Sequence, residues 1–275
     1  MTVESSREQS NLPAILKALF GRTAILAAHP DDETIGTGGH LAMVPQPFVL
    51  IATDGAPADP RDLQAAGCAS RRQYARLRRS ELMAAMSLTG IAPSQVECFG
   101  IADQELSLCM SALARRLARW MHDRAIGLVL THAYEMGHPD HDAVAFAVHG
   151  AVELLRRQVG RPPRIVEFTS YHRGENGEIA CGTFLSHGDP GEAFPLSPAR
   201  RNLKRRMLDA YASQRRTLQP FDTLEERFRP APAYSFTAPP HHRGAFYDDF
   251  DWGMRSERWL VLAAEALTKL EARPC

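Results

Sequence analysis

The chain has 275 residues, enough for one large domain or two small ones with a sizeable hydrophobic core. Its 32 basic and 32 acidic residues balance to a formal net charge of zero, which gives no overall electrostatic reason to expect a nucleic acid or an anionic membrane as partner. The five cysteines are widely separated and form no C-x-x-C pair, so the sequence indicates neither a zinc cage nor a redox dithiol.

The N-terminal stretch Met1–Arg22 lacks the basic start, the continuous apolar run and the small-residue cleavage site of a signal peptide. No later window holds about 18 consecutive apolar residues, the length of a membrane-spanning helix. We therefore expect a soluble, cytoplasmic protein without stable membrane insertion, which begins with a polar leader and a short helix near Leu12–Leu19.

The region from about residue 20 to 173 alternates between short apolar runs and helical patterns. The apolar runs predict strands at Thr23–Ala28, Pro47–Thr53, Val96–Gly100, Ile126–His132 and Arg164–Tyr171. The intervening patterns predict a helix that starts within Gly38–Met43, and further helices at Arg71–Gly90, Met110–Asp123 and Asp140–Arg157. Residues 57–70 are predicted to form a loop.

This regular alternation predicts an α/β fold, a Rossmann-like three-layer sandwich with a mostly parallel sheet covered by helices on both faces. From Gly174 the composition shifts to Gly, Pro, His and Arg, with helices expected near Pro198–Gln214 and Glu257–Ala272. We interpret residues 1–275 as a single domain, with a core at about 20–173 and a C-terminal elaboration at about 174–275.

Four polar segments follow predicted strands, at the sheet edge where open α/β folds gather their reactive groups. In chain order they read HPDDE, TDG, GIADQEL and THAYEMGHPDHD. The first crowds Asp31, Asp32 and Glu33 together, and since like charges raise one another's pKa, a divalent metal ion among them is the first candidate.

The first and last of these segments each deliver histidine and carboxylate on a turn stiffened by proline. A catalytic zinc site uses three N or O ligands and leaves a position open for water, so the two segments contain a suitable set. Hydrolysis also needs a base for the water and a donor for the oxyanion. Because neighbouring side chains of a turn point in different directions, Asp31 and Asp32 can divide the roles of base and ligand, in an order that the residues alone leave open.

The segments AAHPDDETIGTGGHLA, TDG, RRSEL and GHPDHDAV resemble, in order and spacing, the PIG-L/LmbE-like family of zinc-dependent de-N-acetylases. The resemblance covers the N-terminal half to two thirds of the chain. It implies a zinc ion held by His29, Asp32 and His141. It also implies Asp31 as general base, His138 as donor to the oxyanion and Asp140 as the residue that orients His138.

The implied reaction is hydrolysis of the N-acetyl amide of an N-acetylglucosamine-type sugar or glycoconjugate, so the expected partner is a small amino-sugar conjugate. Arg78 or Arg79 would contact sugar hydroxyls or an acidic aglycone, and Asp103 would lie near the sugar. The segment YDDFDWG is typical of a sugar-stacking loop, so Tyr247 or Trp252 is expected to line the pocket.

Each pattern also has a structural interpretation. His29 and His141 taken singly would be core histidines, with the aspartates as helix caps. The glycines at residues 36–39 lack the G-x-G-x-x-G spacing of a dinucleotide site, and we expect them to serve close packing. The basic run Arg71–Leu82 is expected to be a solvated helix or an acidic-substrate contact, and His241 with His242 a surface loop.

Two other functions remain open. The motifs also suit a metal-dependent hydrolase of another small amide or ester, or a non-catalytic Rossmann-like protein that binds a ligand without turning it over. Ferrous iron suits a His-His-Asp donor set as well as zinc does.

Overall fold

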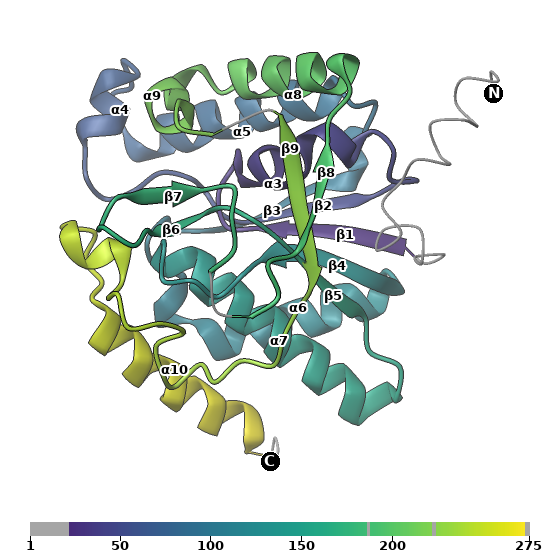
Figure 1. The fold of residues 1–275 in the computed structure, drawn as a ribbon, viewed down its shortest axis with the longest axis vertical. Helices are drawn as coiled ribbons and strands as arrows, with labels where there is room; N and C mark the ends of the chain where they lie inside the picture. Colours follow the sequence, from purple (N-terminus) through teal and green to yellow (C-terminus); the bar gives the residue numbers. More distant parts are fainter. Residues whose placement is uncertain (1–21, 186–187, 222–223, 273–275) are drawn as a thin grey trace.

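The computed structural model describes residues 22–185, 188–221 and 224–272. The helix expected near Leu12–Leu19 lies outside these residues. The described part is one seven-stranded sheet between two layers of helices, together with a separate two-stranded hairpin (Figure 1).

The sheet has the strand order β3-β2-β1-β4-β5-β9-β8. Its strands are β1 (Arg22–Ala27), β2 (Phe48–Thr53), β3 (Val96–Ile101), β4 (Ile126–His132), β5 (Arg164–Phe168), β8 (Glu192–Pro195) and β9 (Glu225–Pro230). Strands β1 to β5 pair in parallel, whereas β9 and β8 pair antiparallel at one edge. The hairpin consists of β6 (Tyr171–Arg173) and β7 (Ile179–Cys181).

Helices cover both faces of the sheet. They are α3 (Asp32–Leu41), α4 (Arg61–Ala65), α5 (Arg71–Ser87), α6 (Met110–Asp123), α7 (Pro139–Val159), α8 (Pro198–Ala210), α9 (Arg215–Leu218) and α10 (Ser256–Glu271). Short 3₁₀ turns occur at η1 (Pro93–Gln95), η2 (Leu106–Leu108), η3 (Ala212–Gln214) and η4 (Phe246–Asp249). Helices α3, α5 and α8 lie on one face, and α6, α7 and α10 on the other (Figure 1).

The apolar runs follow from this arrangement. In β1, Ala24 and Leu26 pack toward α6, α7 and α10, whereas Ile25 and Ala27 pack toward α3, α5 and α8. A parallel strand that is buried on both faces needs apolar residues at every position rather than at alternate ones. The predicted mostly parallel α/β sandwich is therefore confirmed.

The first helix was predicted to begin too late. Helix α3 begins at Asp32, shortly after β1 ends at Ala27, so the acidic turn is its first turn and the glycines lie inside it. A Cβ on Gly36 would lie 2.2 Å from the ring of Phe168, and one on Gly39 would lie 2.5 Å from Leu196. The glycines are there because the helix backbone packs directly on its neighbours.

The region beyond residue 173 extends the sheet that precedes it. Strands β9 and β8 had not been predicted, and they add two antiparallel strands beside β5. The helices expected near Pro198–Gln214 and Glu257–Ala272 are present as α8 and α10, and the segment predicted as a loop contains the short α4. No helix within the described ranges is long and apolar enough to cross a membrane.

Candidate active site

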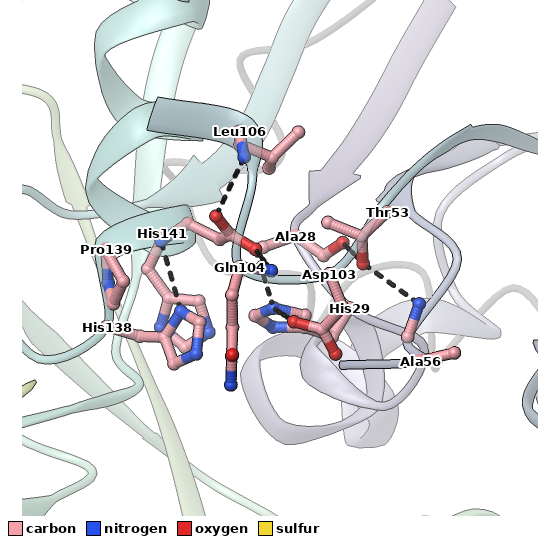
Figure 2. A network of polar contacts seen from close by, with 12 residues as sticks. Ala28, His29, Thr53, Ala56, Asp103, Gln104, Leu106, His138, Pro139 and His141 are labelled. Carbon is pink, nitrogen blue, oxygen red and sulfur yellow. Dashed lines mark hydrogen bonds and ion pairs between the residues drawn. The ribbon is translucent and has the colours of Figure 1, made fainter. Parts of the chain in front are cut away.

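The four polar segments meet at one edge of the sheet. They follow β1, β2, β3 and β4, which are parallel neighbours, so their carboxyl ends point the same way. Figure 2 shows the resulting cluster, with His138 and His141 on one side and His29 with Asp103 on the other.

The three predicted metal ligands converge. The Nδ1 atom of His29 lies 3.1 Å from one carboxylate oxygen of Asp32, and Nε2 of His141 lies 3.2 Å from the other. The two imidazole rings are 5.2 Å apart between centroids. All three residues are buried. The structure thus brings together residues from the first and the fourth polar segments.

The donors around Asp32 are spaced as a divalent ion requires. Two donors at about 2.1 Å from a tetrahedral ion lie about 3.4 Å apart, close to the 3.1 and 3.2 Å between Asp32 and the two imidazoles, which face different oxygens of its carboxylate. Among the described residues, the sets whose donor atoms all lie within 4.8 Å of one another are His29, His138 and His141, then Asp32, His132 and His141, and then His29, Asp103 and Asp140. Burial alone would lower the pKa of His29, but the carboxylates of Asp103, Asp140 and Asp32 raise it well above its ordinary value. The site therefore favours positive charge at His29, which a bound ion would supply in place of the proton.

His132 also belongs to this cluster and had been predicted only as the end of a strand. Its ring stacks on that of His141 at 4.0 Å, and its Nε2 accepts the backbone N–H of Ala28 and lies 3.4 Å from Asp32. Burial, together with the charge of His141, lowers the pKa of His132 to about 4. The signal was a polar residue that ends an apolar strand next to the HPDD segment.

Asp31 occupies the N-cap of α3 in an unusual backbone conformation, with φ 128° and ψ −30°. Such angles are rare for a residue other than glycine and are typical of functional sites. Its carboxylate accepts a hydrogen bond of 3.0 Å from Nη2 of Arg78, which also donates to the carbonyl of Pro30. Burial raises the pKa of Asp31 to about 7, against the opposing charge of Arg78.

The two arginines expected to contact the substrate have different environments. Arg78 is buried, and besides Asp31 it lies 3.5 Å from Glu81, so its charge is directed at protein carboxylates. It also lines the pocket. Arg79 is exposed and is not among the residues that line this pocket. Of this pair, only Arg78 reaches the site.

His138 is the N-cap of α7, and its Nδ1 accepts the backbone N–H of Asp140 at 3.1 Å. Burial and the nearby histidines lower its pKa well below the ordinary value, so the ring is neutral. A neutral imidazole that accepts at Nδ1 carries its proton on Nε2. His138 therefore offers an N–H donor to the pocket.

The carboxylates of Asp140 and Asp103 both lie close to Nε2 of His29. The Asp140 side chain accepts the backbone N–H groups of Gln104 and Leu106, at 2.7 and 3.1 Å, and lies 3.3 Å from Nε2 of His29. Asp103 lies 3.1 Å from the same nitrogen. The contact between Asp140 and His138 is thus made by the backbone of Asp140, while its carboxylate faces another histidine.

Of the two aromatic residues expected at the pocket, the structure places one there. Trp252 lines it, with its ring 4.8 Å from that of His138 and stacked on Phe250 at 4.6 Å. Tyr247 is fully buried in the hydrophobic core beside α7 and α10, because its ring is covered by the helix layer. The expectation that it lines the pocket is wrong.

The cavity over the cluster has a volume of about 190 Å³. Tyr171 and Phe221 also line it, which the sequence analysis had missed since only the tertiary fold brings them there. A larger groove of about 890 Å³ adjoins it and shares its lining residues Gln104 and Trp252.

His241, predicted in a surface loop, is buried, while His242 is exposed.

Comparisons with known proteins agree with the geometry. Residues 24–152 match the family model PIG-L, GlcNAc-PI de-N-acetylase. A 2′-N-acetylparomamine deacetylase of Streptomyces fradiae is 34% identical over 149 residues, which cover 48% of this chain and 52% of that protein. The chain thus matches about half the length of this curated relative.

Solved structures support the fold. A deacetylase of teicoplanin biosynthesis superimposes with a TM-score of 0.57 at 18% identity, covering 76% of this chain and 97% of that one. GalB, the 4-carboxy-2-hydroxymuconate hydratase of Pseudomonas putida, superimposes with a TM-score of 0.54 at 18% identity, covering 78% and 98%. Since these two proteins catalyse different reactions, the reaction has to be argued from the site.

Proposed function

The chain carries a PIG-L family domain over residues 24–152, and on that premise we propose that it is a metal-dependent hydrolase that removes the N-acetyl group from an N-acetylglucosamine-type sugar or glycoconjugate. One observation carries the proposal. A buried His29, Asp32 and His141 set shares a cavity with a separate carboxylate, Asp31, and a separate imidazole donor, His138.

The proposed ion is zinc, with ferrous iron as the alternative, held by His29, Asp32 and His141. When bound, such an ion polarises the amide carbonyl and makes water a nucleophile near neutral pH. Asp32 suits the role of anionic ligand because the neighbouring histidines His141 and His132 keep its pKa well below the ordinary value in spite of its burial.

Asp31 is proposed to take the proton of the attacking water. A general base works best when its pKa is near the operating pH, and burial brings the pKa of Asp31 to about 7. Arg78 holds the carboxylate in place through its 3.0 Å hydrogen bond. The same carboxyl group then returns the proton to the departing amine, so that acetate and a free amino sugar are the products.

His138 is proposed to donate its Nε2–H to the oxygen that becomes negative as the water attacks. The Asp140 backbone N–H fixes the donor, because it occupies Nδ1 at 3.1 Å and so leaves the proton on Nε2. Preorganised donors of this kind contribute about 10²- to 10³-fold to the rate.

The shape of the site supports a substrate larger than the acetylated group. A cavity of about 190 Å³ is below the roughly 300–1,000 Å³ of pockets that enclose a whole drug-sized ligand. We expect the acetamido group and part of its ring in the cavity, with the remaining moiety in the adjoining groove. Trp252 and Phe250 offer a flat apolar surface on which a sugar ring can stack.

The test is acetate release from a panel of N-acetylglucosamine conjugates and non-sugar acetamides or esters. The protein is assayed as purified, after treatment with a chelator, and after zinc or ferrous iron has been added back. We expect acetate release from sugar conjugates that the chelator abolishes and a metal restores.

Two outcomes would contradict the proposal. Turnover restricted to the non-sugar compounds would indicate a hydrolase of another small amide or ester. Tight metal binding without release of acetate from any compound would indicate a protein that binds its ligand without turning it over.

A further inference from the structure

The two ring nitrogens of His29 face different groups. Nδ1 lies 3.1 Å from Asp32, on the side of His141, whereas Nε2 lies 3.1 Å from Asp103 and 3.3 Å from Asp140. A neutral imidazole has one nitrogen that donates a proton and one whose lone pair is free. The two carboxylates at Nε2 can only accept, so Nε2 carries a proton. Nδ1 faces the carboxylate of Asp32, the other proposed ligand, so the Nδ1 lone pair is available to an ion that lies between the two.

We propose that Asp103 is a positioning residue, whose carboxylate accepts the Nε2–H of His29 and thereby holds the ring with Nδ1 directed at the proposed metal site. The inference rests on the proposed function. It gives Asp103 a role different from the sugar contact expected from the sequence. Carboxylates in this position fix the ring and make the ligating nitrogen more basic.

Asp103 is better suited to this role than Asp140. The carboxylate of Asp140 is completely buried and already accepts the N–H groups of Gln104 and Leu106, so it mainly closes the loop after β3. Asp103 lies closer to the imidazole, and its described side-chain contact is the one with His29. Removing its carboxylate therefore tests the interaction with little damage to the loop.

The backbone around Asp103 is held from both sides. Its own N–H donates to the carboxylate of Asp54 at 3.2 Å, and the next N–H, that of Gln104, donates to Asp140 at 2.7 Å. The segments after β2, β3 and β4 thus combine to aim one carboxylate at a histidine that follows β1. This cooperation explains why the polar residues of the TDG and GIADQEL segments accompany the two histidine motifs.

The experiment measures zinc affinity directly, by competition between the purified protein and a chromophoric chelator at fixed pH. The variants are Asp103→Ala, which removes the acceptor, and Asp103→Asn, which keeps an acceptor oxygen but loses the charge. Glu105→Gln is the matched control, since it removes one negative charge from the same loop at an exposed position. The melting temperature of each metal-free variant reports on folding.

We expect Asp103→Ala to weaken zinc binding about 10- to 100-fold, Asp103→Asn less, and Glu105→Gln not measurably. The melting temperature of the metal-free protein should be the same for all, and KM at saturating zinc should not change. Unchanged zinc affinity with a higher KM would overturn the inference in favour of a sugar contact.

A second zinc ion in the wild type that Asp103→Ala loses would also overturn it, because His29, Asp103 and Asp140 would then form a cation site of their own. A wild-type protein that binds no zinc would also overturn the inference, because Asp103 would then have no metal ligand to position. The proposed function is judged separately: tight zinc binding that depends on Asp103, without acetate release, would refute the deacetylase and leave the positioning role standing.

Discussion

At the scale of single residues, the site depends on side chains that hold other side chains in place. The strained backbone of Asp31 is restrained from two directions, since its N–H donates to Glu33 at 3.0 Å and its carboxylate accepts from Arg78. Glu33 is in turn held by the hydroxyls of Thr34 and Tyr211. Strain of this kind persists only where the surroundings enforce it.

Replacing Asp31 with Asn separates the proposed base from the proposed metal ligands. The amide cannot accept a proton, so we expect the rate of acetate release to fall about 10²- to 10⁴-fold. Metal content should stay at the wild-type level, because His29, Asp32 and His141 are unchanged. An active Asp31→Asn enzyme would contradict the assignment of the base, and a metal-free one would indicate that Asp31 is a ligand.

Trp252 is expected to act through binding rather than through the reaction step. Removing its ring in Trp252→Ala would lose a stacking contribution of about 0.5–1.5 kcal/mol, which corresponds to a KM higher by roughly 2- to 13-fold. Trp252→Phe, which keeps an aromatic ring, should retain most of the affinity. Steady-state kinetics on the best conjugate measure both, and an unchanged KM in the alanine variant would place the sugar elsewhere.

At the scale of elements, α3 carries the first histidine motif into position and is packed tightly on both sides. Its glycines face Phe168 of β5 and Leu196, which follows β8. The buried Glu226 of β9 accepts the N–H of Gly39 at 2.7 Å, and its other partners are His40 and Lys204. The C-terminal strands therefore fix the helix that carries Asp32.

A side chain at Gly36 should disturb this packing. Although alanine favours a helix over glycine by roughly 1 kcal/mol, the new Cβ would lie 2.2 Å from Phe168, and overpacking typically costs about 1–3 kcal/mol. We expect Gly36→Ala to lower the free energy of unfolding. Gly38→Ala, whose Cβ would be 3.2 Å from its nearest neighbour, should cost less. Denaturant titration measures both, and equal stabilities would refute this account.

Removing the charge of Glu226 should leave the buried ammonium group of Lys204 without its counter-charge, since the Lys204 Nζ lies 2.8 Å from the Glu226 carboxylate. Breaking a buried ion pair at one partner typically costs about 3–5 kcal/mol, so we expect Glu226→Gln to lower the free energy of unfolding by that order. The neighbouring Glu225→Gln is the control, because its ion pair with Arg227 is partly exposed to solvent and should contribute about 0–1 kcal/mol. Similar denaturant midpoints for the two variants would contradict this role for Glu226.

At the scale of the whole molecule, two hydrophobic clusters on opposite faces of one sheet hold the fold together. The cluster beneath α7 also covers a histidine. The ring of His149 packs against Tyr234 and Phe236, and its Nε2 has no hydrogen-bond partner among the described residues. Burial lowers the pKa of His149 from 6.5 to about 4.

This histidine should make stability depend on pH. Between pH 6.5 and 4 the unfolded chain binds a proton that folded His149 does not, so the free energy of unfolding falls as the pH falls through this window. We expect His149→Phe to remove roughly 2 kcal/mol of that decline between pH 7 and 4.5, a value reduced for partial exposure of the ring. Urea titrations at both pH values test it, and equal declines in the two proteins would refute it.

Much of this fold was predictable because a buried parallel strand has a clear sequence pattern. The runs that became β1 and β4 are apolar at nearly every position, and the HPDD and HPDH segments lie in the loops that follow these strands. Strands β8 and β9 were missed because their sequences, EAFP and EERFRP, are short and largely polar. The pairing that makes them strands is tertiary, since β9 pairs with β5 and β8 pairs with β9.

The site residues likewise divide into those with a recognisable sequence motif and those that only the tertiary structure reveals. The residues of the two histidine motifs were noticed because both motifs follow predicted strands, whereas the ligand set and the individual roles came from the family resemblance and stay predictions. His132 and Tyr171 have no motif of their own and are recognised only once the strands are paired. Tyr247 was misplaced because an aromatic residue in an acidic segment looks the same in sequence whether it faces a ligand or the core.

The pairing of β1 with β4 sets the order in which the protein is assembled. Ala24 pairs with Val129, and His29 meets Asp140 across 111 positions of the chain. Before these strands pair, no segment holds more than one histidine motif, so the unfolded chain has little to offer an ion. We therefore expect the proposed ion to bind after folding, so that the metal in a preparation would reflect the ions available to the folded protein.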